Sequence, residues 1–173
     1  MSLAGIPLWY DQDIILYHGT IDAHVADILN AVDVTRGVNL KDFGRGFYTT
    51  TRQDLASDWA DQMAQQAGAN PAVIQFQVSR NEIALLESLI FVRGDSQAID
   101  YWSFVQYCRT IRNDHNRVFK AWYDLVAGPI SGAGRNKPQS VTPTSFPSTL
   151  LMLRRYWTVA KNSGSYELPT NNC

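Results

Sequence analysis

Three short groups of residues in this chain carry groups that could do chemistry. The first is a histidine–glycine pair, His18 and Gly19, the second is a glycine-rich stretch that ends at Tyr48, and the third is Trp59. A histidine can donate and accept hydrogen bonds, and a glycine lets another group approach the backbone closely. Aromatic rings stack on flat molecules. These residue types indicate a site that could hold a flat ligand.

The glycine-rich stretch matches two familiar motifs only in part. Gly44 to Thr49 lacks the third glycine of a dinucleotide fingerprint and leads into a strand, whereas that fingerprint opens a helix whose N-terminus holds the pyrophosphate. Asp42-Phe43-Gly44 has the letters of a kinase magnesium loop, but neither a glycine-rich loop with a following strand lysine nor a catalytic loop precedes it. The sequence therefore argues against a Rossmann domain and against a kinase.

Metal binding and serine hydrolase chemistry receive no support. His24 stands alone on a short predicted helix, and His115 lies in a polar, turn-like stretch. Cys108 falls inside a helical pattern and Cys173 is the last residue, so their spacing predicts no disulfide framework and no zinc site. Residues 131–134, Ser-Gly-Ala-Gly, lack the strand-to-helix turn of a nucleophile elbow.

The three groups together resemble the histidine–tyrosine branch of the ADP-ribosyltransferase superfamily, which includes diphtheria toxin and the poly(ADP-ribose) polymerases. More closely, the chain resembles a bacterial family of uncharacterised domains placed in that superfamily. Its members run Tyr-His-Gly, Asp-Phe-Gly-x-Gly-Phe-Tyr, Ala-x-x-Trp-Ala and Tyr-Asp-x-Val-x-Gly-Pro. The matching segments here are residues 17–19, 42–48, 56–60 and 123–129. The resemblance covers about residues 14 to 155 and implies split antiparallel β-sheets with flanking helices.

The resemblance also implies an NAD site. His18 would hydrogen-bond the adenine-side ribose, and Gly19 would present its backbone to the nicotinamide carboxamide, with Thr20 beside them. Tyr48 and Trp59, 11 residues apart like the two stacking tyrosines of the polymerases, would cover the two faces of the nicotinamide. His18 and Tyr48 are thus predicted to be catalytic as well as NAD-binding. Trp59 replaces the usual tyrosine and keeps a stacking surface.

The third motif of the superfamily is where the chain departs from the pattern. Transfer from NAD passes through an oxocarbenium-like state, and a late strand usually supplies a Glu, Asp or Gln that stabilises it. Here the Ser-Phe pair at 145–146 has no acid before it, and Gln139 and Thr144 are the nearest catalytic candidates. Asp124, for which a structural role is predicted, and the remote Glu167 are further candidates.

Several functions therefore remain open. The leading prediction is mono-ADP-ribosyl transfer from NAD to an unidentified acceptor, such as a protein, with release of nicotinamide. The alternatives are a weakly active or inactive domain that binds NAD or ADP-ribose, and a protein-interaction domain of the same fold. Taken singly, Tyr48 could be a structural strand residue and Trp59 a core residue, because Trp59 lies in an apolar helical stripe.

The elements that must position these residues follow from periodicity. Alternation and β-favouring residues predict strands at 13–17, entering His18-Gly19, and at 46–50, 72–78 and 122–127. Helical spacing predicts helices at 23–29, 52–66 and 97–111, the second with Thr51 and Asp54 as a capping box. The apolar face predicted for the third helix consists of Ala98, Tyr101, Trp102, Val105 and Cys108. The type of the apolar segment 150–157 is undecided, and residues 128–147 are predicted to form a long irregular loop. The mixture without a regular βαβ rhythm predicts an α+β fold.

Length and composition limit the number of domains and the classes of partner. At 173 residues the chain is expected to be a single domain. Near balance between 15 Lys and Arg and 16 Asp and Glu argues against a duplex nucleic-acid partner. No long apolar run or signal-like start is present, so neither a membrane partner nor secretion by a visible signal is expected. The 20 aromatic residues imply an aromatic-rich core, a stacking site, or both.

Overall fold

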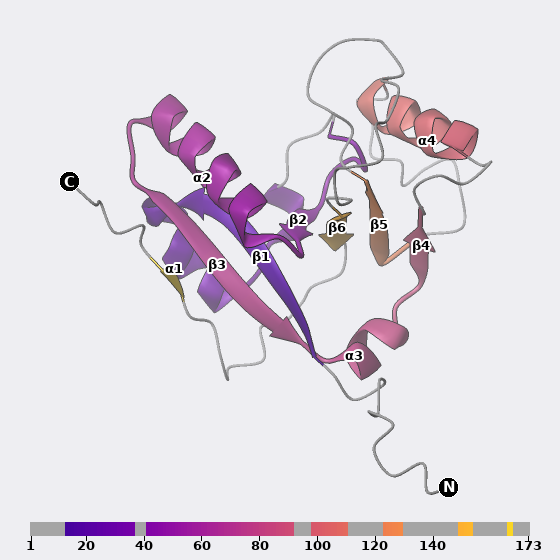
Figure 1. Ribbon diagram of the computed structural model, residues 1–173, viewed down its shortest axis with the longest axis horizontal. Helices are drawn as coiled ribbons and strands as arrows, with labels where there is room; N and C mark the ends of the chain where they lie inside the picture. Colours follow the sequence, from indigo (N-terminus) through magenta and orange to yellow (C-terminus); the bar gives the residue numbers. More distant parts are fainter. Residues whose placement is uncertain are drawn as a thin grey trace, which may run out of the picture.

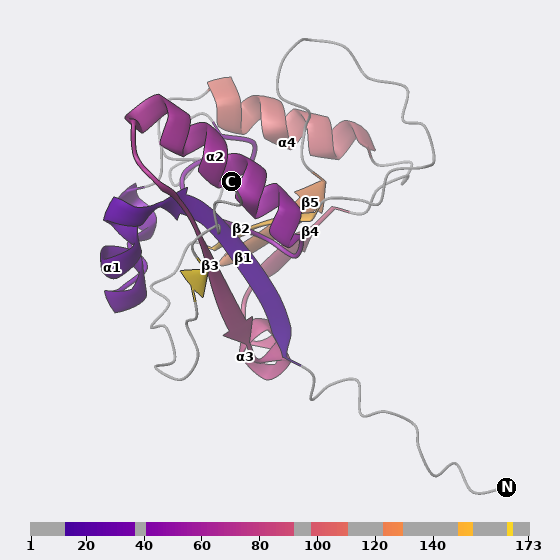
Figure 2. The same cartoon turned by 60° about the vertical axis from the view of Figure 1, so that its left-hand side comes forward.

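The computed structural model describes residues 13–36, 41–91, 98–110, 123–129, 149–153 and 166–167. Its described strands form a seven-stranded sheet in the order β4-β5-β6-β2-β1-β3-β7. All neighbours are antiparallel except β4 and β5, which are parallel. Helices α2 and α4 lie on one side of this sheet and α1 on the other (Figures 1 and 2). The mixed, mainly antiparallel arrangement agrees with the predicted α+β class.

The elements in chain order are as follows. The strands are β1 (Ile14–Ile21), β2 (Phe47–Thr50), β3 (Pro71–Val78), β4 (Ser88–Ile90), β5 (Leu125–Pro129), β6 (Thr149–Leu153) and β7 (Tyr166–Glu167). The helices are α1 (Asp22–Asn30), α2 (Gln53–Ala67), α3 (Arg80–Ala84) and α4 (Ala98–Thr110), and Val34–Arg36 form a 3-10 turn, η2.

Most sequence-predicted elements are present, with shifted ends. Strand β1 runs four residues beyond the expected end at Tyr17, so His18 and Gly19 lie inside the strand and not at its end. Strand β5 begins at Leu125 and continues through Gly128 to Pro129, where the sequence predicted its end and the start of a loop. The undecided segment contributes a strand, β6, over Thr149–Leu153. The rest of the predicted loop, residues 130–147, lies outside the described residues.

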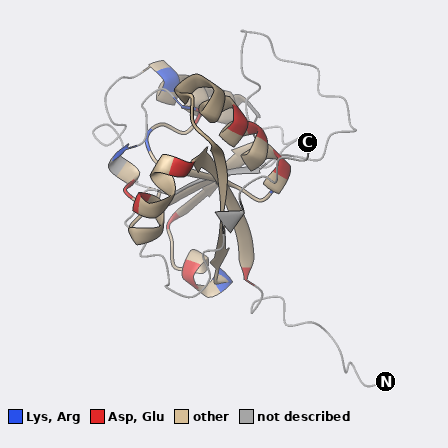
Figure 3. Cartoon of the chain, turned by 90° about the vertical axis from the view of Figure 1, so that its left-hand side faces the viewer, with Lys and Arg blue, Asp and Glu red and all other residues tan. Residues whose placement is uncertain are grey.

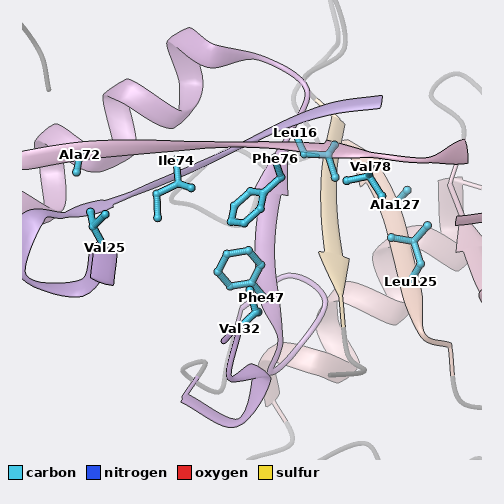
Figure 4. Close-up of a cluster of buried hydrophobic side chains, with 10 residues drawn as sticks. All are labelled: Leu16, Val25, Val32, Phe47, Ala72, Ile74, Phe76, Val78, Leu125 and Ala127. Atoms are coloured by element: carbon cyan, nitrogen blue, oxygen red, sulfur yellow. The ribbon is translucent and has the colours of Figure 1, made fainter. Parts of the chain in front are cut away.

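The alternation of β3 sets the main core. Ala72, Ile74, Phe76 and Val78 are at most 3% exposed, while the residues between them are partly or fully exposed. Phe76 meets Phe47 of β2 edge to face, with ring centroids 5.7 Å apart. Figure 4 shows this cluster between the long pair β1–β3 and the strands β2, β6 and β5, which run across it. The core thus joins the two parts of the sheet from the side of α1, whose Val25 belongs to the cluster.

A second, aromatic cluster lies on the opposite side of the sheet. Phe43 is fully buried at its centre and packs with Tyr101 and Val105 of α4 and Val126 of β5. Tyr101, Val105 and Cys108 form the buried stripe that the sequence predicted for α4. Some of the 20 aromatic residues therefore belong to the core.

Two local predictions are wrong. Helix α2 begins after Arg52, whose side chain makes no capping hydrogen bond; Thr51 stands one position too early to cap, and Asp54 pairs with the Arg52 guanidinium. Trp102, expected on the buried face of α4, is 46% exposed, because the stripe follows Tyr101, Val105 and Cys108 and leaves Trp102 to one side. In the part of the chain that the structure describes, no helix is long and apolar enough to cross a membrane.

Candidate functional site

Strand β1 is paired very differently along its two edges. Toward β3 it forms eight consecutive antiparallel pairs, from Ile14 opposite Val78 to Ile21 opposite Pro71. Toward β2 the structure has one pair, Tyr17 opposite Thr50. We call the place beyond this pair, where β1 and β2 no longer form a ladder, the fork. It separates the part of the sheet covered by α2 from the part covered by α4.

The backbone of Gly19 is turned toward the fork. The Asp22 N–H donates to the Asn70 carbonyl at 3.0 Å, in register with the β1–β3 ladder. Because successive residues of a strand turn their peptide groups to opposite edges, His18 and Thr20 bond toward β3, whereas Gly19 turns toward β2. A continued ladder would place Gly19 opposite Tyr48, yet this pair is not formed.

The His18 ring replaces the missing ladder contact. Its Nδ1 lies 2.7 Å from the Tyr48 carbonyl oxygen. A carbonyl can only accept, so Nδ1 carries the proton and Nε2 is left as an acceptor in the neutral ring. No described residue hydrogen-bonds Nε2. His18 therefore keeps one acceptor nitrogen, and the peptide group of the adjacent residue, Gly19, is turned to the edge that faces β2.

Burial keeps His18 neutral. The residue retains some exposure, but its ring stacks on the core residue Phe47 with centroids 4.2 Å apart. Withdrawal from water lowers the pKa of His18 from 6.5 to about 4; the bond to the Tyr48 carbonyl opposes this shift, and the positive charge of His24 adds slightly to it. At neutral pH the ring can accept a hydrogen bond from a hydroxyl and does not repel a cation.

Gly19 has a second role that the sequence did not indicate. A Cβ at this position would lie 2.0 Å from the carbonyl oxygen of Ala56 and 3.0 Å from the backbone nitrogen of Ala60. Helix α2 thus packs its backbone directly on β1, with Ala56, Ala60 and Ala64 as its buried stripe. The missing side chain is required for this helix–strand contact, and the contact brings Trp59 of the same helix near the fork.

Tyr48 anchors the loop that precedes β2. Its hydroxyl donates to the Gly44 carbonyl and accepts the Phe43 N–H at 3.1 Å. Its ring lies nearly parallel to that of Phe43 at 6.4 Å between centroids, and the residue as a whole is half-buried. The ring is therefore held in one orientation and keeps some surface available for stacking.

The Asp-Phe-Gly-x-Gly sequence, residues 42–46, holds this loop in place. The Asp42 carboxylate accepts from Arg109 of α4, with Oδ1 and Nε 3.0 Å apart. Gly44 has a φ of +80°, a conformation that favours glycine. Phe43 packs on Gly128, where a Cβ would lie 3.0 Å from the ring. Sequence reasoning missed Arg109, whose pairing with Asp42 depends on the tertiary fold.

Trp59 faces the same loop from α2. The Lys41 ammonium lies over its ring, 5.5 Å from the ring centroid. The indole is half-buried, which suits neither a simple core residue nor a fully exposed one. Loop residues 41–46 thus lie between two of the predicted stacking residues, bonded to Tyr48 on one side and reaching Trp59 on the other.

Strand alternation decides which predicted residues share a face. The pair Tyr17–Thr50 places Gly19 and Tyr48 on the side of the sheet that carries α2 and α4. His18 shares the opposite face with Leu16, and its ring reaches β2 through the contact of Nδ1 with the Tyr48 carbonyl. Thr20 is 1% exposed on that face, so its hydroxyl is withdrawn from solvent. The fold gathers His18, Gly19 and Tyr48 at the fork, with Trp59 on the covering helix.

The described third-motif candidates, Asp124 and Glu167, do not lie at the fork. Gln139 and Thr144 lie outside the described residues. The Asp124 carboxylate accepts from the Glu87 N–H at 3.3 Å, and its own N–H donates back to the Glu87 carbonyl at 2.7 Å, which is the structural role expected for it. Glu167 lies opposite Val73 on β7, at the sheet edge beyond β3.

Figure 3 shows Lys and Arg at separate points of the described chain.

Comparison with known proteins identifies a family without a defined activity. Residues 14–136 match the family described as a protein of unknown function, DUF3990, and the chain belongs to this family. No curated protein and no solved structure gives a significant match. The matched residues include the fork, helix α2 and the loop at 41–46.

Proposed function

We propose that this DUF3990 protein binds NAD at the fork and transfers its ADP-ribose to an acceptor, with release of nicotinamide. The observation that carries the proposal is the local exchange of partners at the fork. The His18 ring donates to the Tyr48 carbonyl, which a continued ladder would pair with Gly19. The Gly19 peptide group is turned to the same strand edge and has no ladder partner on β2. A strand edge that ends its ladder beside a neutral histidine is suited to a polar, uncharged ligand group.

Gly19 and His18 supply complementary bonding groups for the two parts of NAD that the resemblance implies. A carboxamide has one acceptor oxygen and an N–H donor, and a peptide N–H and C=O on one strand edge can bind both. The His18 Nε2 can accept from a ribose hydroxyl, because Nδ1 already donates to Tyr48. The low pKa of His18 keeps this acceptor available at neutral pH.

Tyr48 and Trp59 support stacking of the nicotinamide. Both are half-buried; Tyr48 points from β2 to the side of the sheet that carries α2, and a cation, the Lys41 ammonium, already lies over the Trp59 ring. The nicotinamide of NAD is a flat cation, which an electron-rich indole attracts. The described strands form one sheet, joined between β1 and β2 by the single pair Tyr17–Thr50, whereas the resemblance implies split sheets.

The reaction would proceed by exchange at one carbon. The bond from the nicotinamide nitrogen to C1′ of its ribose breaks, and its electron pair stays on the nitrogen, so nicotinamide leaves as a neutral molecule. The acceptor's nucleophilic atom forms the new bond to C1′ and gives up its proton. Fixed dipoles near C1′ stabilise the oxocarbenium-like state between these events.

A domain that binds NAD without transfer is the second candidate. It is favoured by the positions of the two described candidate acids, since Asp124 bonds to the Glu87 backbone and Glu167 lies on an edge strand. Asp124 precedes β5 and Glu167 lies on β7, and neither of these strands pairs with β1 or β2. In this case ligand binding would persist while nicotinamide release stays at the level of the uncatalysed reaction.

Both candidates are tested with one set of proteins. The full chain is titrated with NAD by isothermal calorimetry and thermal unfolding, and nicotinamide release is followed by chromatography with and without candidate acceptor proteins. Ligand at 100 times its dissociation constant adds about 2.7 kcal/mol, which raises the melting temperature by about 5–10 °C. Trp59→Ala and His18→Gln are expected to abolish the shift, whereas Trp102→Ala and His24→Gln keep it. No shift in the wild type at millimolar NAD would reject both candidates.

A further inference from the structure

Lys41 makes an unusual contact for an exposed lysine. Its ammonium lies 5.5 Å from the centroid of the Trp59 ring, within the range of cation–π attraction. None of the ion pairs among the described residues includes Lys41. The indole is thus the ammonium's partner, although Trp59 is the residue that the proposed function assigns to nicotinamide.

The backbone that carries Lys41 is fixed, so the contact is built into the loop. The Lys41 carbonyl accepts the Gly44 N–H at 3.0 Å, and the next residue, Asp42, pairs with Arg109. Phe43, one residue further, is fully buried. These contacts anchor the loop from both sides, while the Lys41 side chain itself is free to change rotamer because the residue is exposed.

A ring face can hold one cation at a time. Two positive charges over the same indole repel each other, so a cationic ring that stacks there must displace the ammonium, whereas an uncharged ring gains no cation–π attraction in exchange. Tryptophan is the strongest of the aromatic cation acceptors. The contact therefore makes Lys41 an internal competitor for any positively charged flat ligand.

We propose that the Lys41-covered face of Trp59 is a site for a flat cationic ring, and that Lys41 occupies it in the free protein and is displaced by the oxidised, positively charged nicotinamide. The proposal rests on the proposed function and deepens it. It assigns Lys41 the role of a competitor that lowers the affinity of this face for a cationic ring, whereas the preference for a cationic over a neutral ring belongs to the Trp59 face itself. The reduced dinucleotide, whose dihydronicotinamide is uncharged, would displace Lys41 less effectively.

The contact itself is tested first, without ligand. The full chain is labelled with 5-fluorotryptophan, and the fluorine resonance of Trp59 is assigned by its loss in Trp59→Phe. Lys41→Ala is expected to shift this resonance and Lys41→Arg to shift it less, while Arg45→Ala, which removes a cation from the same loop, leaves it in place. A Trp59 resonance that is unchanged in Lys41→Ala would overturn the proposal.

The competition is tested with 1-methylnicotinamide, a flat cation without phosphates. It is expected to move the Trp59 resonance and to bind Lys41→Ala about two- to fivefold more tightly than the wild type, the range that an exposed cation–π contact supplies. Lys41→Arg should match the wild type, and neutral nicotinamide should show no such difference. Equal or weaker binding in Lys41→Ala, an equal gain in Arg45→Ala, or no binding at Trp59 would overturn the proposal.

Binding of NAD distinguishes a failure of the Lys41 proposal from a failure of the proposed function. If NAD binds at the fork, but 1-methylnicotinamide binds Lys41→Ala no better than the wild type, Lys41 is not a competitor and the NAD site stands. If neither NAD nor 1-methylnicotinamide perturbs Trp59 in any variant, both proposals fall. NAD that binds the wild type several-fold more tightly than its reduced form, with a smaller ratio in Trp59→Phe, supports the proposed selectivity.

Discussion

The two edges of β1 show how one strand can serve two purposes. Toward β3 its peptide groups are used in an unbroken ladder, and the alternating residues Leu16, Ile74 and Phe76 build the core. Toward β2 one pair, Tyr17–Thr50, joins the strands. Beyond it the His18 side chain, and not a backbone N–H of β1, donates to the Tyr48 carbonyl. The paired edge supplies stability. The forked edge leaves the Gly19 peptide group outside the ladder beside the His18 ring, and binding residues are commonly carried in this way by a rigid scaffold.

The largest expected effect is at Gly19, which belongs both to the ladder with β3 and to the fork. Gly19→Ala places a methyl group 2.0 Å from the Ala56 carbonyl, so helix α2 must move off β1. We expect a loss of about 3 kcal/mol or more in the free energy of unfolding. Gly68→Ala is the matched control, because Gly68 has a φ of +64° but open space around it, and should lose about 1 kcal/mol. Urea denaturation measures both, and similar losses would mean that α2 does not pack on Gly19 as described.

The second effect is a pH dependence from His18. Above about pH 6.5 the ring is neutral in both the folded and the unfolded chain. Between pH 6.5 and about 4 the unfolded chain takes up the proton more readily, so stability falls as pH falls, by at most about 3 kcal/mol, and this contribution stops changing below pH 4. The pH profile of His18→Gln should be flatter than that of the wild type over this window. A profile parallel to that of the wild type, or flattening of the His24→Gln profile instead, would contradict the buried neutral ring.

The third effect isolates the loop beside the fork. Tyr48→Phe leaves the Phe43 N–H and the Gly44 carbonyl without the hydroxyl that joins them, at a cost of about 2 kcal/mol. Tyr17→Phe, on the neighbouring strand, removes a hydroxyl that bonds no described residue and should be neutral. Thermal and urea unfolding compare the two. If the two variants are equally stable, Tyr48 does not anchor the loop.

The smallest effect tests the link from this loop to α4. Asp42→Asn weakens the partly buried pair with Arg109, whose side chain is 41% exposed, and we expect a loss of about 1 kcal/mol. Asp54→Asn, in the exposed pair with Arg52, should be indistinguishable from the wild type. Urea unfolding of the two variants gives the comparison. A loss at Asp54 that matches the loss at Asp42 would show that the pair with Arg109 is no more than a surface contact.

Sequence periodicity was sufficient for the elements whose packing is simple. Helix α2 and strand β3 were predicted to within one residue at each end, because an alanine stripe and a strict alternation each fit one structure only. The strand predicted for β1 ended at Tyr17, just before His18-Gly19, and glycine has a low strand propensity. In the fold, the approach of α2 requires a residue without a Cβ at that point, and the pairing with β3 carries the strand through it.

The candidate site was predicted in composition but not in arrangement. His18, Gly19, Tyr48 and Trp59 were all singled out, yet their partners lie far along the chain or depend on pairing. Neither the Ala56 contact with Gly19 nor the Tyr48 carbonyl bound to His18 leaves a pattern in the sequence. Likewise, Lys41 and Arg109 carried no signal beyond their charge, because loop geometry brings them to Trp59 and Asp42.

The central claim is that the forked edge of β1 is a site for NAD. It is tested most directly by titrating NAD into the full chain labelled with 15N, following the Gly19 amide and the His18 ring nitrogens by NMR. We predict that the free protein has His18 neutral with its proton on Nδ1, and that NAD shifts His18 Nε2 and the Gly19 amide together, saturably, while His24 stays unchanged. A fork whose resonances do not respond to millimolar NAD, or a His18 with its proton on Nε2, would contradict the account.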